Sequence, residues 1–98
     1  MQKTLQSHKT ADMATWLFVD GLNNDLTNQE LADLFIPFGH ILVAHVMYTR
    51  LGEPLGYGYV KMANAEEATQ AAAAMDEQWL GDEIIHLIVI SAPADAYL

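Results

Sequence analysis

Residues 55–62, LGYGYVKM, constrain the fold of this chain more than any other segment, and we call them the tyrosine segment. Successive side chains of a β-strand point to opposite faces, so Tyr57 and Tyr59 share one face while Gly58 and Val60 share the other. A glycine on the inward face predicts that another element, expected to be a helix, packs closely against it. The two phenol rings then lie on the open face, where they can stack on bases or on aromatic groups.

The rest of the chain predicts three more strands and two helices. Residues 15–20, 41–48 and 84–91 are rich in β-branched and aromatic residues, as strands are. A capping box at Thr27 starts one helix, and the alanine-rich residues 65–75 predict a second. The resulting order, β-α-β-β-α-β, is the ferredoxin-like α+β arrangement of a four-stranded antiparallel sheet backed by two helices. Two helices cover only one face of such a sheet, so the other face is expected to be open.

Several other features are explained most simply as structural. Asn64 and Glu67 predict a second N-cap pair, and the alanine face behind them is expected to pack against the glycines of the tyrosine segment. Trp16 and Trp79 are expected to be packing residues, at the end of the sheet and in the final loop. His40 is expected to be solvated. Residues 78–83 predict irregular structure or a small hairpin around a Gly-Asp turn.

The composition excludes several classes of site and bounds the organisation of the chain. Cysteine is absent, which excludes disulfides, thiolate metal sites and cysteine nucleophiles. No spacing forces metal ligands to converge, and no phosphate-cradling loop or nucleophile elbow is present, so we expect no metal, no cofactor and no enzymatic activity. Without a signal peptide or a run of ~18 apolar residues, the chain is expected to be cytoplasmic with no membrane partner. We expect one domain at residues 15–92, between flexible tails at 1–14 and 93–98.

The net charge of the chain opposes the binding of nucleic acid to the open face. Thirteen acidic residues outnumber four basic ones, for a formal net charge of -9. Between Thr15 and Ala92 there are eleven acidic residues and only two basic ones, Arg50 and Lys61. A field of this sign repels polyanions at long range, whereas proteins that bind nucleic acid usually carry a basic surface.

Two motifs nevertheless resemble those of the RNA recognition motif (RRM) family. Residues 55–62 resemble the family's eight-residue motif, with Leu55 in place of a basic residue and Met62 in place of an aromatic one. Residues 17–22, LFVDGL, resemble its six-residue motif. The resemblance covers about residues 16–92, and the short chain resembles the family's small stand-alone bacterial members.

The resemblance implies a strand order of fourth, first, third, second, and it places the base-stacking rings at Phe18, Tyr57 and Tyr59. Lys61 is the one formal positive charge expected on this face, and we expect it to make a minor contact with a phosphate. By alternation along the strands, the same face is expected to carry Asp20, Val43, His45, Met47, Leu55, His86 and Ile88. The opposite face, toward the helices, is expected to carry Leu17, Val19, Ala44, Val46, Val60, Met62, Ile85, Leu87 and Val89.

We therefore expect non-catalytic, stacking-driven binding of single-stranded RNA, with an affinity of roughly micromolar to millimolar. His45 and His86, on opposite edge strands and roughly 14 Å apart, are too far apart to share a metal. Their protonation would add positive charge and tighten RNA binding modestly in mild acid. The alternative is a protein–protein interaction or homodimerisation through the same apolar and aromatic face. A third arrangement, in which residues 93–98 fold back and lay Tyr97 over the rings, would close the face.

Overall fold

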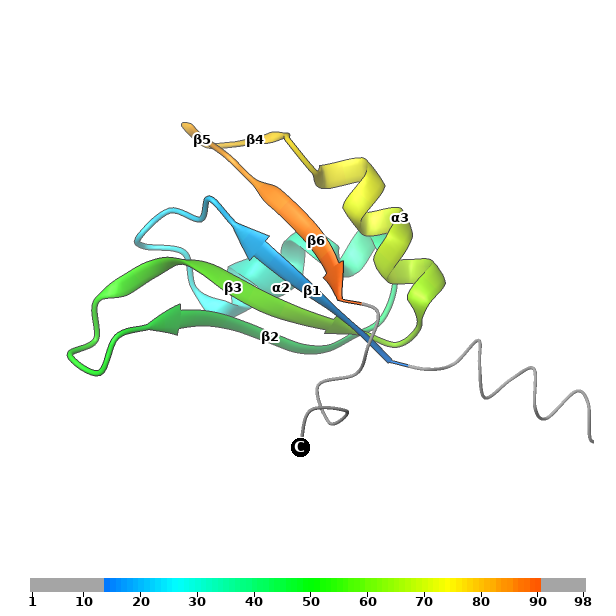
Figure 1. The fold of residues 1–98 in the computed structure, drawn as a ribbon, viewed down its shortest axis with the longest axis horizontal. Helices are drawn as coiled ribbons and strands as arrows, with labels where there is room; N and C mark the ends of the chain where they lie inside the picture. The colour runs from blue at the N-terminus through cyan, green and yellow to red at the C-terminus, as the bar shows by residue number, and fades with distance from the viewer. Residues whose placement is uncertain (1–13, 91–98) are drawn as a thin grey trace, which may run out of the picture.

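Two helices pack on one face of a four-stranded antiparallel sheet in residues 14–90, the part of the chain that the structure, a computed structural model, describes. Figure 1 shows the sheet in front of α2, with α3 lying along the β6 side. The elements in chain order are β1 (Thr15–Asp20), α2 (Asn28–Phe35), the 3₁₀ turn η1 (Ile36–Phe38), β2 (Ile41–Tyr48), β3 (Pro54–Met62), α3 (Ala65–Met75), β4 (Trp79–Leu80), β5 (Glu83–Ile84) and β6 (His86–Ile90).

The strand order is β2-β3-β1-β6, and each neighbouring pair is antiparallel. This confirms the predicted ferredoxin-like fold and its strand order. β4 and β5 form a separate two-stranded hairpin, so the small-hairpin prediction for residues 78–83 is also confirmed. The two central strands, β1 and β3, carry the two motifs side by side.

The side chains expected to face the helices lie on that face. Seven of the nine are buried, namely Leu17, Val19, Val46, Val60, Met62, Ile85 and Leu87, and the other two, Ala44 and Val89, are partly buried against them. From α2, Leu31 and Phe35 complete this core, and from α3 the buried residues are Ala68 and Ala71. The core therefore lies entirely between the sheet and the two helices, and the second face of the sheet contributes nothing to it.

The capping box at Thr27 is present and starts α2. The hydroxyl of Thr27 accepts a hydrogen bond from the backbone N–H of Glu30 (3.1 Å), and the Glu30 carboxylate accepts one from the N–H of Thr27 (3.0 Å). Each side chain satisfies a backbone donor that the first turn of a helix leaves unpaired. The next residue, Asn28, accepts a hydrogen bond from the backbone N–H of Val46 on the edge strand β2 (2.7 Å), which joins the start of α2 to the sheet.

The elements that pack closely against Gly58 are not the alanine-rich helix that was expected. A Cβ added to Gly58 would lie 2.6 Å from the backbone oxygen of His45 in β2 and 3.1 Å from a methyl group of Leu31 in α2. The glycine therefore accommodates the neighbouring strand and α2, not the alanine face of α3, which packs instead around β1 and β6. A helix does press on Gly58, as predicted, but it is the first helix of the fold.

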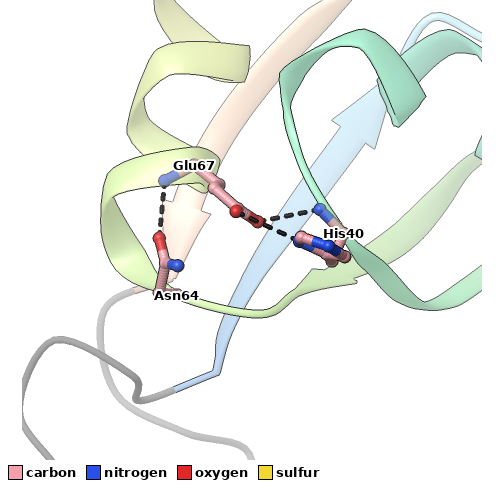
Figure 2. A network of polar contacts seen from close by, with 3 residues as sticks. All are labelled: His40, Asn64 and Glu67. Atoms are coloured by element: carbon pink, nitrogen blue, oxygen red, sulfur yellow. Dashed lines mark hydrogen bonds and ion pairs between the residues drawn. The ribbon is translucent and has the colours of Figure 1, made fainter. Parts of the chain in front are cut away.

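The N-terminus of α3 is capped by Asn64, as predicted, but Glu67 does not complete a capping box. The side chain of Asn64 accepts a hydrogen bond from the N–H of Glu67 (2.9 Å). The Glu67 carboxylate turns instead toward His40, where it accepts the backbone N–H (2.8 Å) and lies 3.4 Å from the ring Nδ1 (Figure 2). Gly39 leaves the space for this carboxylate, since a Cβ there would collide with it. The exposed His40 is therefore a partner of Glu67 and not simply solvated.

The hydrogen bond from the backbone of His40, followed by its ring and by Asn64, holds the pKa of Glu67 below its usual range, although partial desolvation opposes this. An ionised Glu67 therefore contributes stability above about pH 4.5, and the contribution is lost as the pH falls through the lowered pKa. We expect Glu67→Gln to lower the midpoint of urea unfolding at neutral pH, with the difference from the wild type shrinking below about pH 4.5. Glu66→Gln is the matched control, because Glu66 is exposed in the same first turn of α3. An equal pH-dependent effect in both variants would show that the helix dipole, and not His40, is responsible.

The expected tails extend beyond the described residues, which begin at Ala14 and end at Ile90. The tail boundaries and the proposed fold-back of Tyr97 therefore stay predictions. Within residues 14–90, neither α2 nor α3 has the length and apolar character that a bilayer-spanning helix requires.

Candidate functional site

Three aromatic rings lie together on the open face of the sheet, and we call Phe18, Tyr57 and Tyr59 the ring cluster. The centroid of the Phe18 ring lies 5.3 Å from that of Tyr57 and 5.4 Å from that of Tyr59, and the two tyrosine rings are 6.2 Å apart. None of the three pairs is parallel, and all three side chains are partly exposed. They come from β1 and β3, which pair with Phe18 opposite Tyr59, so the backbone of the two central strands fixes their spacing.

The pairing of the strands extends the cluster to both edges of the sheet. Tyr59 lies opposite His45 on β2, and Phe18 lies opposite Ile88 on β6. Paired residues of antiparallel strands share a face, so both neighbours flank the rings as expected. Ile88 is 60% exposed and extends the apolar surface of the ring cluster toward β6. The ring Nδ1 of His45 lies 3.1 Å from the backbone oxygen of Val46, which directs the imidazole along the edge of β2.

Trp16, expected to be a packing residue at the end of the sheet, is partly buried and lies on the open face. It pairs with Lys61 across β1 and β3, and its ring centroid lies 6.4 Å from that of Tyr59 at an interplanar angle of 85°. The ammonium nitrogen of Lys61 lies 5.5 Å from the centroid of the Trp16 ring, within the range of a cation–π contact. The sequence could have predicted this position, because Trp16 and Phe18 are two residues apart in one strand and must share a face.

The opposite end of the face is acidic. Asp20 lies between Tyr57 on β3 and His86 on β6, and its carboxylate accepts a hydrogen bond from the N–H of Gly21 (2.9 Å). A pocket beyond it is lined by Asp20, Asn23, Asn24, Asp25, Leu55, Asp82 and Glu83, among others. Across the described residues, no three acidic or histidine side chains converge closely enough to hold a metal ion. The face is therefore polarised, with the Lys61 cation beside one end of the ring cluster and carboxylates beside the other.

Strict alternation breaks down near the β2–β3 turn, where Met47 and Leu55 lie. Val46 pairs with Gly58, but Tyr48 pairs with Pro54. The single residue between them on β2, Met47, therefore lies opposite three residues of β3. Gly56 within this bulge has a φ of +81°, which favours glycine. Leu55 lines the acidic pocket described above and is 43% exposed. Its place at the border of the face follows from the bulge and not from simple alternation.

The two histidines predicted on this face lie on different edge strands, His45 on β2 and His86 on β6, with β3 and β1 between them. They therefore lie on opposite edges of the sheet, as the implied strand order predicted. Trp79, expected to pack in the final loop, is instead 69% exposed on the β4–β5 hairpin, where it pairs with Ile84. The packing prediction for Trp79 is wrong because a two-residue strand pair has no second layer above it.

The sequence matches the RNA recognition motif family over residues 17–86, which include both motifs, α2, α3 and most of the sheet. The chain belongs to this family. The match includes the ring cluster and Lys61 but ends before the last residues of β6, and Trp16 lies just outside it.

The curated relatives of this RRM are longer proteins. A cytotoxic granule-associated RNA binding protein, tiar-1, from Caenorhabditis elegans is 39% identical over 70 residues, which is 70% of this chain and 17% of that protein. A spliceosome associated factor 3, described as a U4/U6 recycling protein, from Mus musculus is 30% identical over 92% of this chain and 9% of its own length. This RRM thus spans less than a fifth of these two relatives. Both are eukaryotic, and they give no support to the expected likeness to small bacterial members.

Solved structures agree with the fold of this RRM. The second RRM domain of the yeast poly(U)-binding protein Pub1 has a TM-score of 0.72 and 28% identity, and the alignment covers 81% of this chain and 96% of that one. A structure of the first two RRM domains of the same yeast protein gives a TM-score of 0.75 over 84% of this chain and 50% of that one. The roles of the individual side chains of this RRM on the open face remain predictions.

Proposed function

We propose that this domain binds single-stranded RNA without catalysis, by stacking bases on Phe18, Tyr57 and Tyr59. The observation that carries the proposal is the ring cluster itself, three partly exposed rings within 5.3 to 6.2 Å of one another on the face that α2 and α3 leave uncovered. Aromatic platforms of this kind recognise single strands, whose bases are free to leave their neighbours and stack on a protein ring. Relatives described as RNA-binding or polyadenylate-binding proteins support RNA as the ligand.

The charges on the face favour weak binding driven by stacking. Lys61 is the only basic residue that the described strands place on the open face, and Asp20 lies at its other end. Each stacked base contributes about 1–3 kcal/mol, whereas neutralised phosphates contribute in proportion to their number. With eleven acidic and two basic residues in residues 14–90, long-range attraction of RNA is absent. An affinity of roughly micromolar to millimolar follows from these opposing terms.

The salt dependence of binding tests this balance. For one or two neutralised phosphates, log K for a single-stranded oligonucleotide should fall with log salt with a slope of only about -0.7 to -1.4. Lys61→Met retains the aliphatic stem and removes the ammonium, so we expect the slope to become shallower by about 0.7. Titration of oligoadenylate at several salt concentrations measures both slopes, and Arg50→Met in the β2–β3 turn is the matched control. A steep slope in the wild type would contradict binding by stacking.

A protein partner is the second candidate, and the exposed aliphatic border of the face favours it. Ile88 is 60% exposed beside Phe18, and Val43 is exposed on the β2 side next to Lys61. The acidic surface around this border fits a basic protein segment. A second copy of this chain would be held by the apolar border alone. NMR titration separates the candidates. Shifts of the ring-cluster resonances on addition of single-stranded RNA support RNA, whereas shifts that depend on protein concentration alone support self-association.

A further inference from the structure

We propose that Trp16 is a fourth stacking position of the open face, and that with Lys61 it holds an additional nucleotide beyond the ring cluster. The inference rests on the proposed function and adds to it the direction in which the bound RNA extends. It is carried by the juxtaposition of Trp16, Tyr59 and Lys61 at one end of the face.

The rings of the open face form a continuous series. From Trp16 the series passes to Tyr59 at 6.4 Å, then to Phe18 at 5.4 Å and to Tyr57 at 5.3 Å. Trp16 and Phe18 are two residues apart on β1, so their rings are separated by about 7 Å along the strand. The indole is therefore the next flat surface for a strand whose other bases lie on the ring cluster.

Within residues 14–90, the Trp16 side chain is only partly buried. It meets Tyr59 at 85°, and an edge contact of this kind covers at most one face of either ring. The ammonium of Lys61 lies 5.5 Å from the indole centroid and is attached through a flexible stem. A nucleotide presents a flat base and an anionic phosphate, and this end of the face presents a flat ring and a cation. The phosphate can draw the ammonium away from the indole, which leaves the ring to the base.

The other end of the face is unsuited to a further nucleotide. Beyond Tyr57 the strand β1 ends at Asp20, and the adjoining pocket adds the carboxylates of Asp25, Asp82 and Glu83. A phosphate there would meet like charges. Because Lys61 lies beside the Trp16 end of the ring series and carboxylates crowd the other end, the bound strand is expected to extend past Trp16 and not past Asp20.

The length of the oligonucleotide tests the assignment. In the wild type, extending an oligoadenylate from three to five nucleotides should raise the affinity about tenfold, the size expected for one further stacked base. Trp16→Leu keeps an apolar side chain in β1 but removes the ring, so it should bind the trinucleotide as the wild type does and lose the gain with length. Trp79→Leu is the matched control, because Trp79 is exposed on the β4–β5 hairpin, and it should behave as the wild type.

Fluorescence gives a second measurement that does not require the leucine variant to fold. The chain has two tryptophans, so Trp79→Phe leaves Trp16 as the one indole reporter. Stacking of adenine should quench its emission with the five-nucleotide ligand and much less with the three-nucleotide one. If Trp16→Leu keeps the full gain with length, or the emission is unchanged at saturation, the inference is wrong while RNA binding by the ring cluster stands. If no oligonucleotide binds the wild type, the proposed function fails and this inference with it.

Discussion

Replacing Phe18 and Tyr57 together by alanine is expected to abolish measurable binding of single-stranded RNA. Each ring supports one stacked base worth about 1–3 kcal/mol, so the double variant should lose about 2–6 kcal/mol. This is a large fraction of the roughly 4–8 kcal/mol that a complex of millimolar to micromolar affinity has in total. The rings lie on the open face, and the core on the other face does not include them. We therefore expect the NMR spectrum to keep the dispersion of a folded protein while the RNA-induced shifts disappear.

The matched control for this variant removes two exposed apolar side chains from elsewhere. Ile36 on η1 and Trp79 on the β4–β5 hairpin are 57% and 69% exposed, and both lie outside the ring cluster. Alanine at both positions should leave RNA binding unchanged. Equal loss in the two double variants would mean that general hydrophobicity, and not the ring cluster, holds the RNA. Retained binding in the Phe18 and Tyr57 variant would remove the ring cluster as the site.

The second large effect concerns stability, and it depends on Gly58. Gly58→Ala should lower the free energy of unfolding by about 1–3 kcal/mol, because the added methyl group overpacks a site with no free volume. The nearest atom is the backbone oxygen of His45 at 2.6 Å, which cannot move aside as the end of a side chain can. Urea unfolding followed by circular dichroism measures the change, and an unaltered m-value would place the effect in the folded state.

Gly52 separates crowding from backbone strain. A Cβ there meets no atom within 4 Å, but its φ is +85°, a conformation that L-residues adopt at a cost of about 1 kcal/mol. Gly52→Ala should therefore destabilise the protein by backbone strain alone and by less than Gly58→Ala. If the two variants lose the same stability, the close approach of β2 and α2 to Gly58 is not what requires glycine.

The sequence predicted most of the fold because its signals are local. The capping box at Thr27 involves atoms three residues apart, and strand alternation has a period of two, so both can be read directly. The buried face of β1, occupied by Leu17 and Val19, and the strand order followed from these patterns and from the resemblance of the two motifs. The same alternation placed Tyr57 and Tyr59 together, whereas Phe18 was added to them by the resemblance of residues 17–22 to the six-residue motif of the family.

Features that depend on contacts between distant residues were not predicted. His40 and Glu67 are 27 residues apart, and only the packed fold brings the N-terminus of α3 to the start of β2. The partner of Gly58 depends on which helix crosses β3, which alternation does not specify. Trp16 was missed for another reason, because its position at the beginning of β1 was interpreted as the packed end of a sheet. The bulge at Gly56 required a positive φ that the sequence alone allows but does not impose.

The hydrogen bonds of Val46 have a consequence for how copies of this domain meet one another. An edge strand normally offers unpaired backbone groups as a template for strand addition, which is a route to aggregation. On β2, Asn28 occupies the N–H of Val46, and the imidazole of His45 lies at its oxygen. A second chain would have to displace both side chains to extend the sheet there. Strand addition along β2 is thus hindered at Val46, inside this edge strand.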